Sequence, residues 1–88
     1  MDRKLLEMLR SPETRQPLAL LKSSELESLN QAIAGGGVVR ADGTPQQQPL
    51  RQALITADRA EIYRIDDGIP VLLAEEAIDT RRVPGFAP

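Results

Sequence analysis

The stretch Asp67-Gly68-Ile69-Pro70-Val71-Leu72-Leu73 decides how the last part of this chain is expected to fold. An Asp-Gly pair is typical of a tight turn, and the apolar run that follows it has the length of one β-strand. Pro70 has no backbone N–H to donate, so the strand is expected at the edge of a sheet. An edge strand can pair with a partner protein, or Ile69, Val71 and Leu73 can simply be core residues. The core interpretation is preferred for these three side chains.

Four runs before this turn predict the rest of a small sheet. Ala53-Leu54-Ile55-Thr56 and Ile62-Tyr63-Arg64-Ile65 are two strand-like runs separated by a short polar connection. Pro17-Leu18-Ala19-Leu20-Leu21 predicts an earlier strand, and Val38-Val39-Arg40 a brief one. We expect an antiparallel sheet of three or four strands.

The beginning of the chain predicts a short helix. Asp2 is a suitable N-cap, because its carboxylate can accept hydrogen bonds from the free backbone amides of the first turn. Pro12 is expected to end the helix, since the residue before a proline is driven out of the helical region. The apolar positions of the helix form one stripe: Leu5, Leu6, Met8 and Leu9.

A second helix is predicted in the middle of the chain. Ser24-Glu25-Leu26-Glu27 matches a capping box, in which Ser24 and Glu27 satisfy each other's free backbone amides. Leu26, Leu29 and Ile33 recur at helical spacing and are expected to face the sheet. The glycines at 35–37 are expected to end this helix, and without a following Lys-Ser/Thr pair they do not form a phosphate-binding loop.

The remaining segments are expected to be irregular. Residues 44–49 contain two prolines and three glutamines and predict a flexible polar loop. Residues 75–78 predict one helical turn, and residues 80–88 a flexible tail.

The composition limits the classes of protein to which this chain can belong. A chain of 88 residues is long enough for one small domain, and it contains only one Tyr and one Phe, so its core must be aliphatic. The formal net charge is -2, which disfavours nonspecific nucleic-acid binding. No apolar run is long enough to cross a bilayer and no export signal is visible, so a cytoplasmic protein is expected.

Catalytic residues are not expected. The chain has no Cys and no His, which removes thiolate nucleophiles, imidazole bases and the usual transition-metal ligands. Ser11 or Thr14 as a nucleophile would need a lysine base, and a hydrogen bond within their own turn is the preferred role for both. The carboxylate pairs Asp66-Asp67 and Glu75-Glu76 are explained by a turn and a helix start better than by acid–base chemistry or a magnesium site.

The order of these segments resembles a known family. Leu5-Leu6-Glu7-Met8-Leu9, Ser11-Pro12-Glu13-Thr14, Leu54-Ile55-Thr56 and the run from Tyr63 to Leu73 follow one another as in the small bacterial YcaR-type proteins. These proteins are similar to the methyltransferase activator Trm-one-one-two. The resemblance implies a zinc-ribbon-like domain over 1–79, with an insertion at about 21–52 that contains the second helix. The closing Asp-Gly-Ile-Pro-Val-Leu-Leu run is its most specific element.

The departures from the family pattern concern its metal site. Where the family carries cysteines, this chain has the neutral hydroxyls of Ser11, Thr14 and Thr56, which cannot supply the anionic sulfur that zinc prefers. We therefore expect no zinc and no other cofactor. A structural zinc ion contributes folding free energy, so extra aliphatic packing from the inserted helix is expected in its place.

The sequence thus predicts an α+β fold: a small antiparallel sheet with an N-terminal helix and an inserted helix, zinc-ribbon-like without zinc. The resemblance implies a non-enzymatic binding module, an adaptor or activator of an S-adenosylmethionine-dependent methyltransferase of the translation apparatus. A self-associating structural protein and a small enzyme with no recognisable site remain alternatives. If a protein partner is bound, the expected contact residues are Ile69, Pro70, Val71, Leu72 and Leu73.

Overall fold

A computed structural model describes Lys4 and residues 8–86 of the chain. Its elements, in chain order, are β1 (Leu18–Leu20), α2 (Ser23–Ala34), β2 (Gln52–Thr56), β3 (Glu61–Asp66), β4 (Ile69–Pro70), the 3₁₀ turn η1 (Ala74–Glu76), β5 (Ile78–Asp79) and the 3₁₀ turn η2 (Thr80–Arg82). The predicted N-terminal helix falls mostly outside the described residues, because Asp2, Leu5 and Leu6 are not among them. The two described positions of its apolar stripe differ: Met8 is exposed, and Leu9 packs against the sheet.

The strands form one antiparallel sheet in the order β1-β2-β3-β4, and β5 also pairs with β3. β4 and β5 lie along the same edge of β3: Pro70 pairs with Ile65 at one end, and Ile78 pairs with Ile62 at the other. The sheet and the helix make an α+β fold of zinc-ribbon-like character, as predicted. The described sheet has five strands rather than three or four, because β5 was not predicted.

The predicted strand over 69–73 is shorter than expected. β4 ends at Pro70, and the backbone N–H of Val71 makes one further hydrogen bond to the carbonyl oxygen of Arg64 at 2.9 Å. The chain then leaves the sheet, turns through η1 and returns as β5. A continuous apolar run does not show where along it the pairing ends, so the sequence pattern did not reveal that only its first two residues form a strand.

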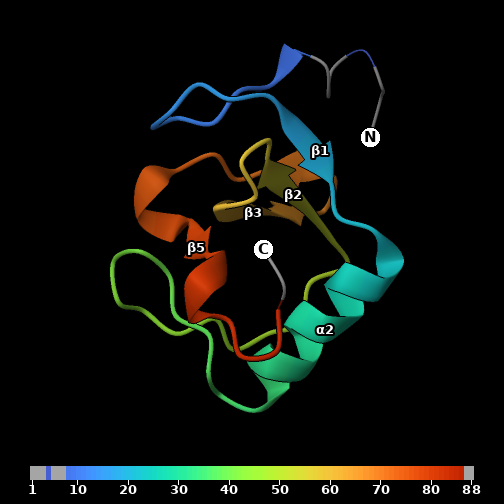
Figure 1. The fold of residues 1–88 in the computed structure, drawn as a ribbon, viewed down its shortest axis with the longest axis vertical. Coiled ribbons are helices and arrows are strands. Elements are labelled where there is room, and N and C mark those ends of the chain that lie inside the picture. The colour runs from blue at the N-terminus through green and yellow to red at the C-terminus, as the bar shows by residue number, and fades with distance from the viewer. Residues whose placement is uncertain (1–3, 5–7, 87–88) are drawn as a thin grey trace.

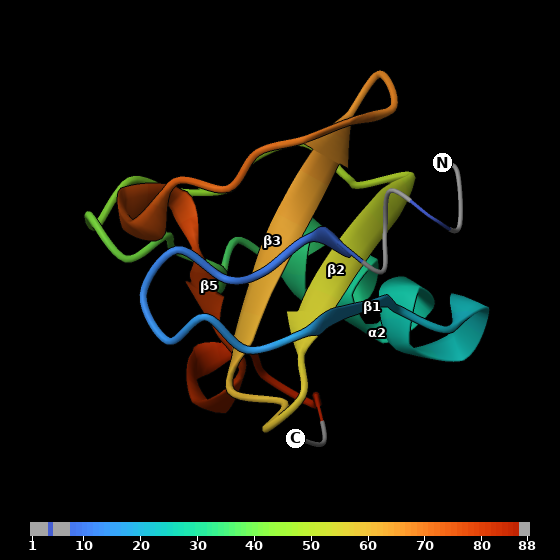
Figure 2. The same cartoon turned by 90° about the horizontal axis from the view of Figure 1, so that it is seen from above.

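Different segments of the chain pack against the two faces of the sheet. Because neighbouring residues of a strand point to opposite faces, Ala53 and Ile55 face α2 while Leu54 faces away from it. Figure 1 shows α2 lying along the sheet, and Figure 2 shows the segment that precedes β1 crossing the opposite face. The second face buries a smaller cluster: Leu18, Leu54, Tyr63, Ile65 and Ala77, with Leu9 and Leu72 against it.

α2 packs as its sequence predicts but begins earlier. Leu29 and Ile33 are buried in the core and Leu26 packs against it, so the predicted apolar stripe faces the sheet. The predicted capping box of Ser24 and Glu27 is wrong: the N-cap is Lys22, whose backbone N–H donates to the carboxylate of Glu25 at 3.4 Å. Glu25 also pairs with Arg59, and this contact explains why the shifted start is preferred.

The end of α2 is as predicted. Gly35 is the C-cap, and Gly36 has φ +78, a left-handed conformation that glycine adopts without a steric penalty. Gly37 approaches the C-terminal segment closely, because a Cβ at this position would lie 3.1 Å from Cγ of Pro84. The glycine run therefore ends the helix and leaves room for Pro84 of the C-terminal segment.

The segment expected as a flexible tail from residue 80 is packed as far as it is described. Val83 and Phe86 belong to the core cluster beneath α2, and Thr80 is buried. The Thr80 hydroxyl donates to the carbonyl oxygen of Arg59 at 2.7 Å, and its backbone N–H donates to Ala60 at 3.0 Å. Two apolar residues spaced three apart among prolines and arginines give no strand or helix pattern, so the sequence did not reveal this packing.

The loop before β2 is also more buried and more hydrogen-bonded than its polar composition suggests. Gln46 is only 5% exposed, and Leu50 lies in the core. The side chain of Asn30 on α2 exchanges two hydrogen bonds of 2.8 Å with the backbone of Leu50. Val39 and Pro45 form a single bridge, in place of the brief strand expected over 38–40. In the described residues no helix is both long and apolar enough to span a membrane.

Candidate functional site

The turn that leads into β4 is built by two residues in left-handed conformations. Asp66 and Ile69 are paired across the hairpin, and between them Asp67 has φ +49 and Gly68 has φ +78. Two positive φ angles define the turn whose twist matches that of antiparallel strands. The Asp-Gly signal of the sequence is therefore confirmed, and it positions the segment expected to contact a partner.

Within that segment, two of the five expected contact residues point outward. Ile69 is 67% exposed and Leu73 is 47% exposed, whereas Pro70, Val71 and Leu72 are half-buried. Leu72 packs against the cluster on the face opposite α2. The preferred interpretation of Ile69 and Leu73 as core residues is therefore wrong. Ile69 is paired within β4 but no other described segment covers its side chain, and Leu73 lies beyond the point where the chain leaves the sheet.

The edge itself is open along the described part of the chain. β4 pairs with β3 alone, as Pro70 predicted, and the two exposed apolar side chains lie at its beginning and just beyond its end. Two exposed apolar side chains beside an open strand edge offer apolar surface, and the edge offers backbone hydrogen-bonding groups, to a docking partner.

The three hydroxyl residues at the expected ligand positions are engaged within their own turns. The hydroxyls of Ser11 and Thr14 are hydrogen-bonded to each other at 2.7 Å, and Ser11 Oγ accepts from the backbone N–H of Gln16 at 3.2 Å. Thr56 Oγ1 donates to Asp58 at 2.6 Å and accepts from the backbone N–H groups of Ala60 and Glu61, each at 3.2 Å. Ser11 and Thr56 thus each bind backbone amides of one turn, and Thr14 is hydrogen-bonded to Ser11.

These turns do not suit a zinc ion. Neutral hydroxyls are poor zinc ligands, and those present already have hydrogen-bond partners. Among Lys4 and residues 8–86, no three His, Cys, Asp or Glu side chains are grouped so as to hold a metal ion. The two turns must be held together in another way.

Gln16 and Asp58 link the two turns directly. The Gln16 side-chain amide donates to Asp58 Oδ2 at 2.9 Å, and its Oε1 accepts from the backbone N–H of Asp58 at 2.8 Å. Hydrogen bonds from Thr56, Gln16 and the Ala60 backbone hold the pKa of Asp58 below its ordinary value. No sequence pattern indicates this pair, because its members are 42 positions apart and neither belongs to a motif.

Removing the charge of Asp58 is expected to weaken the link between the turns in a pH-dependent way. Asp58 has a lowered pKa in the folded protein, so its contribution to stability is present above its ordinary pKa of 3.8 and is lost as the pH falls below that value. The melting temperatures of the parent and of Asp58→Asn, measured from pH 7 to pH 2, should therefore converge in acid.

Gln16→Ala should lower the melting temperature at pH 7 by about 5 °C, as loss of one or two partly exposed hydrogen bonds does.

The double variant is the control for this interpretation. If Gln16 and Asp58 act on each other, Gln16→Ala combined with Asp58→Asn should cost less than the sum of the single changes. Additive losses would show that the two side chains stabilise their turns independently.

The pKa of Glu61, another carboxyl group near the first turn, is raised, whereas that of Asp58 is lowered. Burial raises the pKa of Glu61, and the nearby carboxylate of Glu13 raises it further. The hydroxyl of Tyr63, a buried residue of the same strand, reaches Glu61 at 3.5 Å, and burial raises the pKa of that phenol. The folded protein therefore favours the protonated form of Glu61 more than an exposed carboxyl group would.

The other acidic pairs also have structural roles. Asp66 accepts from Arg64 Nε at 2.9 Å, and Asp67 forms the turn before β4. Glu76 Oε1 forms ion pairs with Arg64 Nη2 at 2.7 Å and with Arg40 Nη1 at 3.6 Å. Adjacent carboxylates were correctly interpreted as turn and helix-start residues, but their arginine partners could not be identified from a pattern in the sequence.

Comparison with known proteins agrees with this geometry. The profile of the Trm112p-like protein family matches residues 2–68. A solution NMR structure of a protein from Xylella fastidiosa is similar to the chain, with 59% sequence identity, a TM-score of 0.81, and coverage of 100% of this chain and 91% of that one. Among curated proteins no significant match is found. The matched residues include both hydroxyl turns and the Asp-Gly turn before β4, and the chain belongs to the Trm112p-like family.

Proposed function

We propose that this protein is a non-enzymatic adaptor or activator of an S-adenosylmethionine-dependent methyltransferase of the translation apparatus. Membership of the Trm112p-like family supports the adaptor class. Translation takes place in the cytoplasm, so the proposal includes a cytoplasmic location for this protein, as expected from its sequence.

The exposure of Ile69 and Leu73 beside an unpaired edge is the observation that carries the proposal. Their exposed fractions, 67% and 47%, are high for large aliphatic side chains in a small domain. A partner strand laid against β4 would hydrogen-bond its free backbone groups, and apolar partner side chains would cover Ile69 and Leu73. Contact through Pro70, Val71 and Leu72, the half-buried part of the segment, belongs to the same proposal.

A charged residue in place of the exposed Leu73 should abolish capture of the partner. Leu73→Asp places an unpaired charge in a surface that becomes desolvated on binding, which is costly at the centre of an interface. The tagged chain, expressed in its native cell, should recover a methyltransferase identified by mass spectrometry, and Leu73→Asp should lose it. Because Leu73 is exposed, the melting temperature of the variant should remain close to that of the parent.

Leu20 provides a matched control. It is another exposed leucine, but it lies on β1 at the opposite edge of the sheet. Leu20→Asp should leave capture unchanged. Loss of capture with Leu20→Asp and not with Leu73→Asp would contradict docking at β4.

Two further outcomes would replace the proposal. A parent chain that elutes as a dimer from a sizing column, and becomes a monomer with Leu73→Asp, would show that the edge binds a second copy of the chain. Turnover of a small substrate by the isolated chain would favour an enzyme instead.

A further inference from the structure

A pair of arginines meets away from the docking edge. Arg64 comes from the middle of β3 and Arg40 from the loop after α2, and both contact the carboxylate oxygen Oε1 of Glu76, at 2.7 Å and 3.6 Å. One carboxylate shared by two guanidinium groups leaves the charge of the pair only partly compensated. Asp66 also pairs with Arg64, but its side chain is 56% exposed, so water screens its charge.

The guanidinium of Arg64 has an unused donor. Nε donates to Asp66 and Nη2 to Glu76, but Nη1 is buried and has no hydrogen-bond partner among the described residues. The Arg64 side chain is 14% exposed. A buried donor on a charged group is costly to leave unsatisfied, and such a donor is rare in a native structure.

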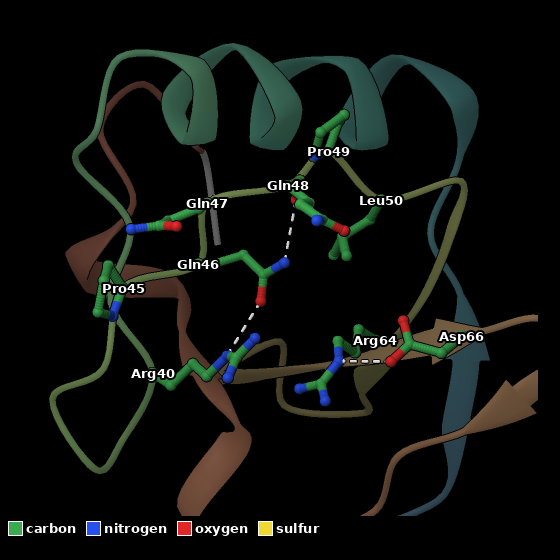
Figure 3. A pocket seen from close by; sticks show the side chains of 9 residues that line it. All are labelled: Arg40, Pro45, Gln46, Gln47, Gln48, Pro49, Leu50, Arg64 and Asp66. Carbon is green, nitrogen blue, oxygen red and sulfur yellow. Dashed lines mark hydrogen bonds and ion pairs between the residues drawn. The ribbon is translucent and has the colours of Figure 1, made fainter.

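A hollow of about 310 Å³ lies beside this pair. Figure 3 shows the Arg40 and Arg64 side chains at one side of it and the loop 45–50 along the other. Gln46 is fixed there, because its Oε1 accepts from Arg40 Nε at 3.1 Å and its Nε2 donates to the carbonyl oxygen of Gln48 at 3.0 Å. Apolar side chains complete the lining: Pro45, Pro49 and Leu50.

We propose that this hollow binds a small organic monocarboxylate, whose oxygens accept from the guanidinium groups of Arg40 and Arg64. A guanidinium N–H donates well to a carboxylate oxygen, and the apolar lining suits a short hydrocarbon part. Since Nε and Nη2 of Arg64 are already paired with Asp66 and Glu76, the ligand would rely mainly on Arg40 and on a shift of Arg64 that uncovers Nη1. Phosphate fits less well, because the neighbouring carboxylates of Glu76 and Asp66 would repel a dianion more strongly than a monoanion.

Titration of the isolated chain with butyrate at constant ionic strength tests the proposal. The Nε–H resonance of Arg64 and the side-chain amide resonances of Gln46 should shift in a saturable way at millimolar butyrate, and inorganic phosphate should bind at least several-fold more weakly. Arg40→Gln removes one guanidinium at the less buried side of the pair and should weaken butyrate binding at least tenfold. Arg81→Gln makes the same charge change at an exposed arginine outside the hollow and should bind like the parent.

Each alternative result contradicts the proposal. No saturable shift at up to 50 mM of either anion, in a chain with the parent's melting temperature, would show that the hollow holds solvent only. Equal weakening in Arg40→Gln and Arg81→Gln would indicate general attraction of anions to a basic surface. Tighter binding of phosphate would assign the site to another ligand class. If Arg40→Gln does not fold, Gln47→Trp, which fills the hollow from an exposed lining residue, should abolish the butyrate shifts.

Discussion

Replacing Leu29 by alanine is expected to lower the free energy of unfolding by about 2–5 kcal/mol. Leu29 is fully buried at the centre of the cluster between α2 and the sheet. The change removes apolar contacts and leaves a cavity that the surrounding side chains fill only in part. Domains of ordinary stability unfold with about 5–15 kcal/mol, so the variant should be close to unfolding at 37 °C.

Urea denaturation followed by circular dichroism measures this loss. Glu27→Ala is a matched control on the same helix, because Glu27 is exposed, and it should change stability by less than about 0.5 kcal/mol. The midpoint for Leu29→Ala should fall with little change in slope, which would show that the same cooperative unit unfolds. A midpoint equal to that of the parent would mean that α2 does not contribute to the core.

The parts of the fold that the sequence predicted are those with a strong local signal. Strands β1, β2 and β3 were each predicted from a run of aliphatic residues, and the helical spacing of Leu26, Leu29 and Ile33 placed α2 against the sheet. The Asp-Gly pair predicted the β3–β4 turn, because few residues adopt two successive left-handed conformations.

What the sequence did not reveal depends on contacts between distant residues. The start of α2 is set at Lys22 by Glu25, which also reaches Arg59, and local propensity alone favoured Ser24. Gln46 belongs to a polar tract, yet it is buried because Arg40 and the Gln48 carbonyl satisfy both ends of its amide. Such partners lie beyond the range of any periodic pattern.

The edge location of the predicted contact segment is confirmed, and its role in binding a partner stays a prediction. The edge strand and Pro70 followed from the sequence, whereas the outward direction of Ile69 and Leu73 depends on where the chain leaves the sheet. The hydroxyls of Ser11 and Thr14 were placed correctly in a turn of their own, whereas the contacts of Thr56 with the turn after β2 were not predicted. The Gln16–Asp58 link and the Arg40–Arg64 pair join residues without any common motif, so only the tertiary structure identifies them.

The C-terminal segment leads to the second large expected effect: Phe86→Ala should lower the free energy of unfolding by about 3–5 kcal/mol. Phe86 is the only Phe of the chain and is 8% exposed, in the same cluster as Leu29 and Val83. Among the described residues of this cluster Phe86 is the one aromatic side chain, so its removal takes away a large share of the packing there.

Arg82→Ala separates this packing from a general effect of changing the segment. Arg82 is an exposed residue of η2, and its truncation should leave the urea midpoint nearly unchanged. Phe86→Leu keeps an apolar side chain and should recover part of the stability lost with alanine, because much of the buried apolar area is restored. If Phe86→Ala unfolded at the same urea concentration as the parent, the segment after β5 would be dispensable for the core and would be a flexible tail, as its sequence suggests. A loss shared by Phe86→Ala and Val83→Ala, with Arg82→Ala unaffected, would instead establish that the core of this small domain is completed by its last residues.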